Sequence, residues 1–85
     1  MNEIFYTTIE NQRRDDGTYG LLYDHFYEVE GQASAHDRAL AKFFTICAAA
    51  ATSGIPYHEA VLLSSRSGFL RRELWDRRAE ASPEE

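Results

Sequence analysis

Alternating apolar and polar residues over the first thirty positions predict a β-hairpin. The segments 4–11 and 21–30 are rich in aromatic and β-branched residues, and the polar stretch QRRDDGTYG separates them. Such residues favour strands, and an Asp-Gly pair between two of these runs is typical of a hairpin turn. We therefore expect an N-terminal antiparallel hairpin with a long turn.

The second predicted strand divides into two faces, because successive side chains of a strand point to opposite sides of the sheet. One face would be mostly apolar and would cover a core; it holds Leu21, Tyr23, His25, Tyr27 and Val29. The other holds Leu22, Asp24, Phe26, Glu28 and Glu30. This second set predicts an acidic outer surface in which the ring of Phe26 stands exposed.

Residues 35–53 have the pattern of a helix. Ser34 followed by Asp37 resembles a capping box, and Gly54 can adopt the left-handed conformation that ends a helix. The apolar stripe consists of Leu40, Phe43, Phe44, Cys47 and Ala51. The reverse side carries the small residues Ala41, Thr45, Ala48, Ala49 and Thr52. Since small side chains allow close approach, we expect this helix to be packed on two sides.

The segment after Gly54 fits two structures. Pro56 suits the first turn of a helix and Glu59 suits its N-terminal dipole, which favours a helix over 56–64. The alternative is a short buried strand over 60–65 that joins the hairpin.

Residues 69–79 are predicted to be helical, because Leu70 and Leu74 lie one turn apart and Glu73 precedes Arg77 by four positions. The tail 81–85 is predicted to fray. The expected architecture is therefore one α+β domain over residues 1–80. It would comprise the hairpin, with or without a third strand, packed on a central Ala-rich helix and followed by C-terminal helical structure.

Composition and charge add three expectations. With 85 residues, 44% of them hydrophobic and 27% charged, the chain has room for one small core. The net charge of −5 lies in residues 1–30, which hold seven acids and two bases. Cys47 is the single cysteine, and no segment has the pattern of a signal or a membrane span, so we expect a soluble, cytoplasmic protein.

Motifs for catalysis are weak. His58 and Glu59 match the start of a zinc-protease helix, but Leu62 takes the position of the second ligand. The serines at 64, 65 and 67 lack the surroundings of a nucleophile elbow. We therefore expect no catalytic residues, no metal site and no cofactor.

Residues 56–79 also resemble a helix-turn-helix, whose second helix would carry Arg71, Arg72, Arg77 and Arg78. Ser64 stands where the turn usually has glycine, and acids interrupt the basic face. A small DNA-binding regulator is the alternative function that this pattern predicts.

The hairpin acids predict a different kind of surface. A strand advances about 3.3 Å per residue, so a row of carboxylates along one face resembles the charge ladder of a nucleic acid backbone. An aromatic anchor among charges suits a basic protein partner. The predicted partner-binding residues are Asp15, Asp16, Asp24, Phe26, Glu28 and Glu30. A further possibility is an assembly protein that forms a homodimer through an exposed strand edge.

The acidic hairpin DDGTYGLLYDHFYEVEG and the helix ALAKFFTICAAAATSG together resemble the small phage-encoded anti-CRISPR proteins that act on type I systems. The resemblance implies a non-enzymatic inhibitor in the bacterial host cytoplasm. Such an inhibitor would bind the positively charged nucleic-acid groove of an RNA-guided surveillance complex. Its acidic residues would mimic DNA phosphates and exclude the target DNA.

Overall fold

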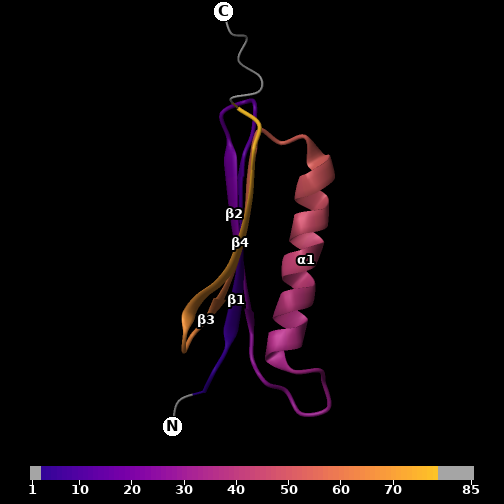
Figure 1. Ribbon diagram of the computed structural model, residues 1–85, viewed down its shortest axis with the longest axis vertical. Helices are drawn as coiled ribbons and strands as arrows, with labels where there is room; N and C mark the ends of the chain where they lie inside the picture. Colours follow the sequence, from indigo (N-terminus) through magenta and orange to yellow (C-terminus); the bar gives the residue numbers. More distant parts are fainter. Residues whose placement is uncertain (1–2, 79–85) are drawn as a thin grey trace, which may run out of the picture.

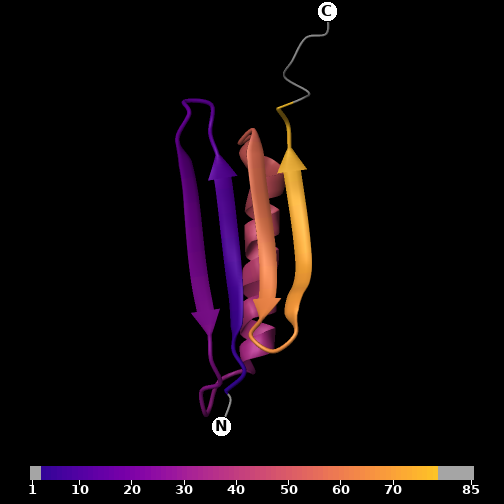
Figure 2. The same cartoon turned by 90° about the vertical axis from the view of Figure 1, so that its left-hand side faces the viewer.

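The computed structural model describes residues 3–78, which form one antiparallel sheet with a helix on one of its faces (Figure 1). In chain order the elements are β1 (Tyr6–Arg13), β2 (Tyr19–Phe26), α1 (Ala35–Ser53), β3 (Tyr57–Ser64) and β4 (Gly68–Asp76). The strands lie side by side in the order β2-β1-β3-β4 (Figure 2). The predicted α+β class, N-terminal hairpin and central helix are confirmed.

The segment after α1 is a second hairpin. β3 pairs antiparallel with β1 along its whole length, and β4 pairs antiparallel with β3. The strand alternative for residues 60–65 is therefore right, and the helices predicted over 56–64 and 69–78 are wrong. β3 finds backbone hydrogen-bond partners in β1 on one side and in β4 on the other, and this pairing outweighs the local signals that suggested helices over 56–64 and 69–78. Ala79 and the predicted tail 81–85 lie outside the described residues.

This correction also removes the structural basis of the helix-turn-helix. The residues proposed for the recognition helix lie in β4 or directly after it, so no helix of residues 56–78 is present to enter a major groove.

The turn between β1 and β2 is short and ordered by hydrogen bonds. The backbone N–H of Arg14 donates to Thr18 O at 2.9 Å, and the N–H of Thr18 donates to Asp16 Oδ1 at 3.0 Å. Gly17 has φ +87°, which a residue with a side chain rarely adopts. The predicted long turn is therefore a compact one.

Both ends of α1 lie where the sequence predicts. Ser34 Oγ accepts a hydrogen bond from the N–H of Asp37 at 3.0 Å, and Gly54 is left-handed with φ +74°. The last turn of α1 has no basic residue of its own. The guanidinium of Arg77 donates instead to Ala50 O and Ile55 O, both at 3.0 Å, and so caps the helix from beyond β4.

The core lies between α1 and the sheet. It is formed by Ala39, Phe43 and Ile46 of α1 with Ala60 and Leu62 of β3. Small alanines on both elements let the helix approach β3 closely. The reverse side of α1 faces solvent, since Ala41, Thr45, Ala48, Ala49 and Thr52 are all exposed. The predicted packing of this helix on two sides is wrong.

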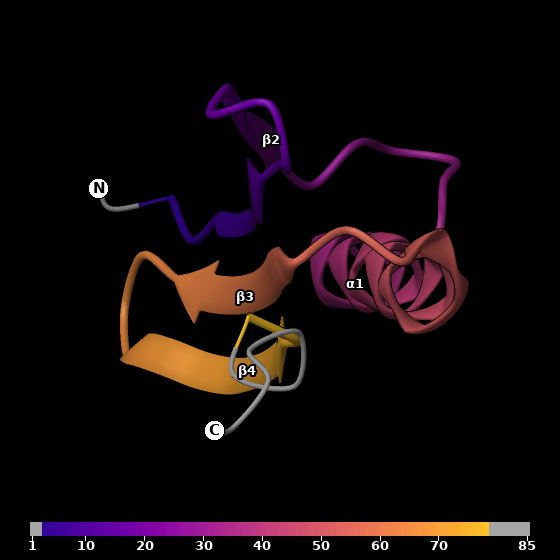
Figure 3. The ribbon, with the colours of Figure 1, turned by 90° about the horizontal axis from the view of Figure 1, so that it is seen from above.

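One face of the sheet has no second layer. Seen from above, α1 lies on one side of the strands, and no element of residues 3–78 lies on the other (Figure 3). Among the described residues, no helix has the length and hydrophobicity that crossing a membrane requires.

Candidate functional site

The predicted acidic row lies on the side of the sheet that α1 occupies, but Asp24, Glu28 and Glu30 all stay exposed to solvent. Phe26 is half-buried and packs against the core. Asp24 Oδ2 lies 3.5 Å from Lys42 Nζ of α1, and Glu28 Oε2 accepts a hydrogen bond from the N–H of Ala35 at 2.9 Å. The expectation of an exposed Phe26 ring is therefore wrong, because the ring packs against the core, whereas the acids beside it remain exposed.

The remaining predicted acids lie elsewhere on the hairpin. Asp15 and Asp16 occupy the turn before β2, whereas Glu30 is exposed in the loop that follows it. The hydrogen bond from the Thr18 hydroxyl lowers the pKa of Asp16. Of the six predicted partner-binding residues, Asp24 and Phe26 therefore share the helix side of β2, and the other four lie in the turn before β2 or in the loop after it. Whether any of them contacts a partner stays a prediction.

The opposite face of the sheet carries apolar residues on all four strands, with Asn11 and Glu59 between Leu21 and Leu74 in their row. We call its centre the open sheet face; its residues are Ile9, Leu21, Tyr23, Val61, Leu63 and Leu74. Ile9 pairs with Tyr23 on one side and with Val61 on the other. A register shift opposite Leu62 and Leu63 inserts one extra residue into β4. This shift explains why the even-numbered Leu74 lies on the open sheet face.

The helix-covered face of the sheet is the more polar of the two. β1 places Thr8, Glu10 and Gln12 under or beside the helix, and β3 places His58 and Ser64 there. On the open sheet face Tyr23 is 55% exposed, Leu21 45% and Leu74 40%. An exposed apolar patch bordered by polar residues is typical of a contact surface. The chain therefore leaves its more apolar sheet face uncovered.

The sequence identified this set of residues but placed it on the wrong side. Leu21, Tyr23 and His25 were expected to cover a core, and the alternation that groups them is correct. The side that the helix takes depends on the loop between β2 and α1. There Arg38 bonds to Tyr27 O and Ala33 O, and Glu28 bonds to the N–H of Ala35. No periodicity within β2 predicts those contacts.

Charged groups on this face are paired with one another. The Arg72 guanidinium donates to the Glu59 carboxylate, which raises the pKa of Arg72. Asp76 accepts from Arg78 at 2.8 and 2.9 Å, and this hydrogen bonding lowers the pKa of Asp76 to about 2. Because each carboxylate already has a cationic partner, a contact that covers the face leaves neither charge alone.

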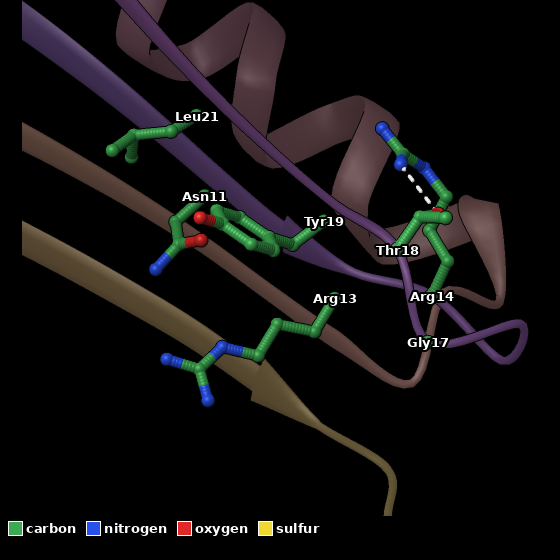
Figure 4. Close-up of a pocket in the computed structure, with 7 residues that line it drawn as sticks. All are labelled: Asn11, Arg13, Arg14, Gly17, Thr18, Tyr19 and Leu21. Atoms are coloured by element: carbon green, nitrogen blue, oxygen red, sulfur yellow. Dashed lines mark hydrogen bonds between the residues drawn. The ribbon is translucent and has the colours of Figure 1, made fainter.

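A depression of about 570 Å³ lies at the end of the face beside the first hairpin turn (Figure 4). Its wall includes Tyr19, whose ring lies beside the side chain of Asn11. The guanidinium of Arg14 donates to Thr18 Oγ1 at 3.0 Å, whereas that of Arg13 lies over the ring of Tyr57, 5.1 Å from its centroid. These two cations extend away from each other (Figure 4), so they do not converge on one anion.

A serine, a histidine and a carboxylate meet beneath α1. His58 Nε2 lies 2.7 Å from Glu10 Oε2, and His58 Nδ1 lies 3.3 Å from Ser53 Oγ. The order resembles a hydrolase triad. However, Ser53 Oγ also donates to Ala50 O at 3.4 Å and accepts from the N–H of Ile55 at 3.2 Å, as expected of a helix-end serine. The carbonyl end of a helix disfavours an oxyanion, so this arrangement suits a structural role better than a catalytic one.

Other reactive groups are dispersed. Within residues 3–78, no three His, Cys, Asp or Glu side chains lie close enough to hold a metal ion. Cys47 is half-buried in the helix–sheet layer, and burial raises the pKa of its thiol. A thiol of this kind is largely protonated at neutral pH and a poor nucleophile.

Comparisons of the chain with protein-family models, with curated proteins and with solved structures found no match.

Proposed function

We propose that this protein works as a non-enzymatic binding protein and that the open sheet face is its contact surface for another protein. The observation that carries this proposal is the distribution of side chains over the two faces of the sheet. The helix covers a face that includes Glu10, Gln12 and His58, while Leu21, Tyr23 and Leu74 of the open sheet face are exposed. Covering apolar surface is the main driving force for protein association.

A protein fits this surface better than a nucleic acid does. Aliphatic residues form the centre of the face. On this side of the sheet Arg72 and Arg78 are paired with carboxylates, and Arg13 lies over the ring of Tyr57. A sheet that binds nucleic acid needs cationic side chains that are free to contact phosphates, and aromatic rings that stack on the bases. The exposed aromatic rings alone do not supply that charge.

The inhibitor function that the anti-CRISPR resemblance implies stays a hypothesis about the partner. If it holds, we expect the inhibitor to dock through the open sheet face, since Asp24 and Glu28 are engaged with α1. A variant with Asp24, Glu28 and Glu30 changed to Lys tests the alternative in which the acids make the contact. Under our proposal this variant loses stability near α1 but keeps its partner.

Site-specific photo-crosslinking tests the contact surface. A photoreactive amino acid is placed at Tyr23 on the open sheet face and, as a matched control, at Thr45 on the exposed side of α1. In the cells in which the protein occurs naturally, we expect protein adducts from position 23 and few from position 45. Equal adducts at both positions, or none from position 23, would contradict the proposal.

A further inference from the structure

We infer that the partner on the open sheet face is a second copy of this chain, packed face to face about a two-fold axis that runs parallel to the strands. This inference rests on the proposed function, because it uses the same face. It differs from pairing along a strand edge, since it leaves β2 and β4 as edges. Each copy would keep its helix on the outside of a layered dimer.

The two hairpins complement each other under this symmetry. The axis places β2 of one copy over β4 of the other, and β1 over β3. Residues that pair across the four strands form a row, and each row lies over the same row of the second copy. The register then sets Leu21 opposite Leu74 of the second copy, and Ile9 opposite Val61 of the second copy. Apolar side chains meet apolar side chains in both rows.

Most polar groups match in the same arrangement. Asn11 comes opposite Glu59 of the second copy, so an amide faces a carboxylate. Thr7 comes opposite Leu63 of the second copy, but its hydroxyl is already paired with His25. Tyr23 comes opposite Arg72 of the second copy, where a ring and a guanidinium attract each other. Every one of these contacts occurs twice, as a two-fold interface requires.

The other face-to-face symmetry is less favourable. A two-fold axis perpendicular to the strands places β1 over β1 and β3 over β3, with the rows reversed. If this axis crosses midway between the rows of Ile9 and Asn11, Asn11 lies opposite Ile9 of the second copy and Glu59 opposite Val61. If it crosses on the row of Ile9, Glu59 lies opposite Leu63 of the second copy. Covering polar groups with aliphatic ones costs free energy, so complementarity selects the axis parallel to the strands.

The face is large enough for a dimer of modest affinity. Strands of eight residues are about 26 Å long, and four strands are about 19 Å wide, so each copy contributes about 500 Å² in projection. The two copies together bury about 1,000 Å², near the lower limit for specific interfaces. A dimer that dissociates on dilution is therefore expected.

A charge exchange across the interface tests this geometry in the purified full chain. Leu21→Glu and Leu74→Arg each place a charge against a leucine of the second copy, at two contacts per dimer. In sedimentation over a dilution series, each variant alone is expected to raise the dissociation constant at least about 100-fold. An equimolar mixture of the two is expected to form a heterodimer, because the new carboxylate then faces the new guanidinium.

Thr45→Arg, on the exposed side of α1, serves as the control and should dimerise like the wild type. A wild-type chain that stays monomeric throughout the series overturns the inference. Dimerisation of both charged variants overturns it as well and points to edge pairing. If the wild type is monomeric while position 23 crosslinks to a different protein in cells, the second-copy inference fails and the proposed function stands.

Cysteine cross-linking provides a test that does not depend on charged variants. Leu21→Cys and Leu74→Cys chains, both with Cys47→Ala, are mixed and treated with a short bifunctional maleimide, since packed sheets lie about 10 Å apart. A covalent heterodimer formed in preference to either homodimer supports the axis parallel to the strands. Preferential linkage between two Leu21→Cys chains would contradict it.

Discussion

Glu10 Oε2 lies 2.7 Å from His58 Nε2 across the β1–β3 pair, directly beneath the C-terminal end of α1. The His58 side chain is 2% exposed, so its buried Nε2 depends on Glu10 for a hydrogen-bond partner. Gln12 holds the carboxylate from the other side by donating to it at 2.9 Å. This pair ties the two central strands together on the helix-covered face.

Glu10→Ala is expected to lower the free energy of unfolding by about 1–3 kcal/mol, because it leaves a buried His58 nitrogen without a partner. Chemical denaturation measures the loss, with Glu30→Ala in the exposed loop as the control. Replacing both partners, as in Glu10→Leu with His58→Phe, should recover most of the stability. If the double variant were less stable than Glu10→Ala alone, the Glu10–His58 pair would contribute more to the free energy of unfolding than the hydrogen bonding that each partner provides for the other.

Arg77→Ala is expected to destabilise the protein by about 1–3 kcal/mol, since it removes the cation that caps the last carbonyl groups of α1. Hydrogen exchange should accelerate first at the C-terminal turn of the helix. Arg66→Ala, in the exposed β3–β4 turn, is the matched control and should have little effect. Equal losses from the two substitutions would contradict the capping role of Arg77.

Thr8→Val should preserve or raise stability, by up to about 1 kcal/mol. The Thr8 hydroxyl is buried and has no hydrogen-bond partner among residues 3–78, so its removal costs no bond and ends a desolvation penalty. Thermal unfolding of the variant and of the wild type under the same conditions shows whether the stability rises or falls. A clear fall in the unfolding midpoint would mean that the hydroxyl is satisfied in solution.

Ser53 should behave as an ordinary serine. Incubation of the folded protein with a fluorophosphonate is expected to leave Ser53 unmodified, because its hydroxyl is engaged at the helix end and faces backbone carbonyl groups. Intact mass measurement detects any adduct. Labelling that is lost in His58→Phe would reveal an activated nucleophile and would contradict a purely binding function.

Local chemistry made α1 predictable from the sequence. The hydroxyl of Ser34 and the left-handed Gly54 act within a few residues of the helix ends, so the chain carries their signals beside the positions they control. β4 was missed for the opposite reason. Its leucines and its charged pairs have helical spacing, while the partner that makes it a strand is β3, and the extra residue opposite Leu62 breaks the two-residue alternation.

The candidate site was predictable only in part. Alternation placed Leu21 and Tyr23 together and Asp24 and Phe26 together, as the structure has them. Which set meets solvent depends on the side that α1 takes, and that follows from contacts of Arg38 and Glu28 in the connecting loop. The apolar patch itself needs β1, β3 and β4 beside β2, an order that no single segment contains.

Hydroxyl-radical footprinting of Tyr23 most directly tests whether the open sheet face is a covered contact surface. The measurement compares the oxidation of Tyr23 in the native cells with its oxidation in the dilute, purified Leu74→Arg variant, using the exposed Phe44 of α1 as the internal reference. We expect Tyr23 to be protected in the cells while Phe44 is oxidised equally in both samples. Equal oxidation of Tyr23 in the two samples would contradict the account, because the face would then remain in contact with water.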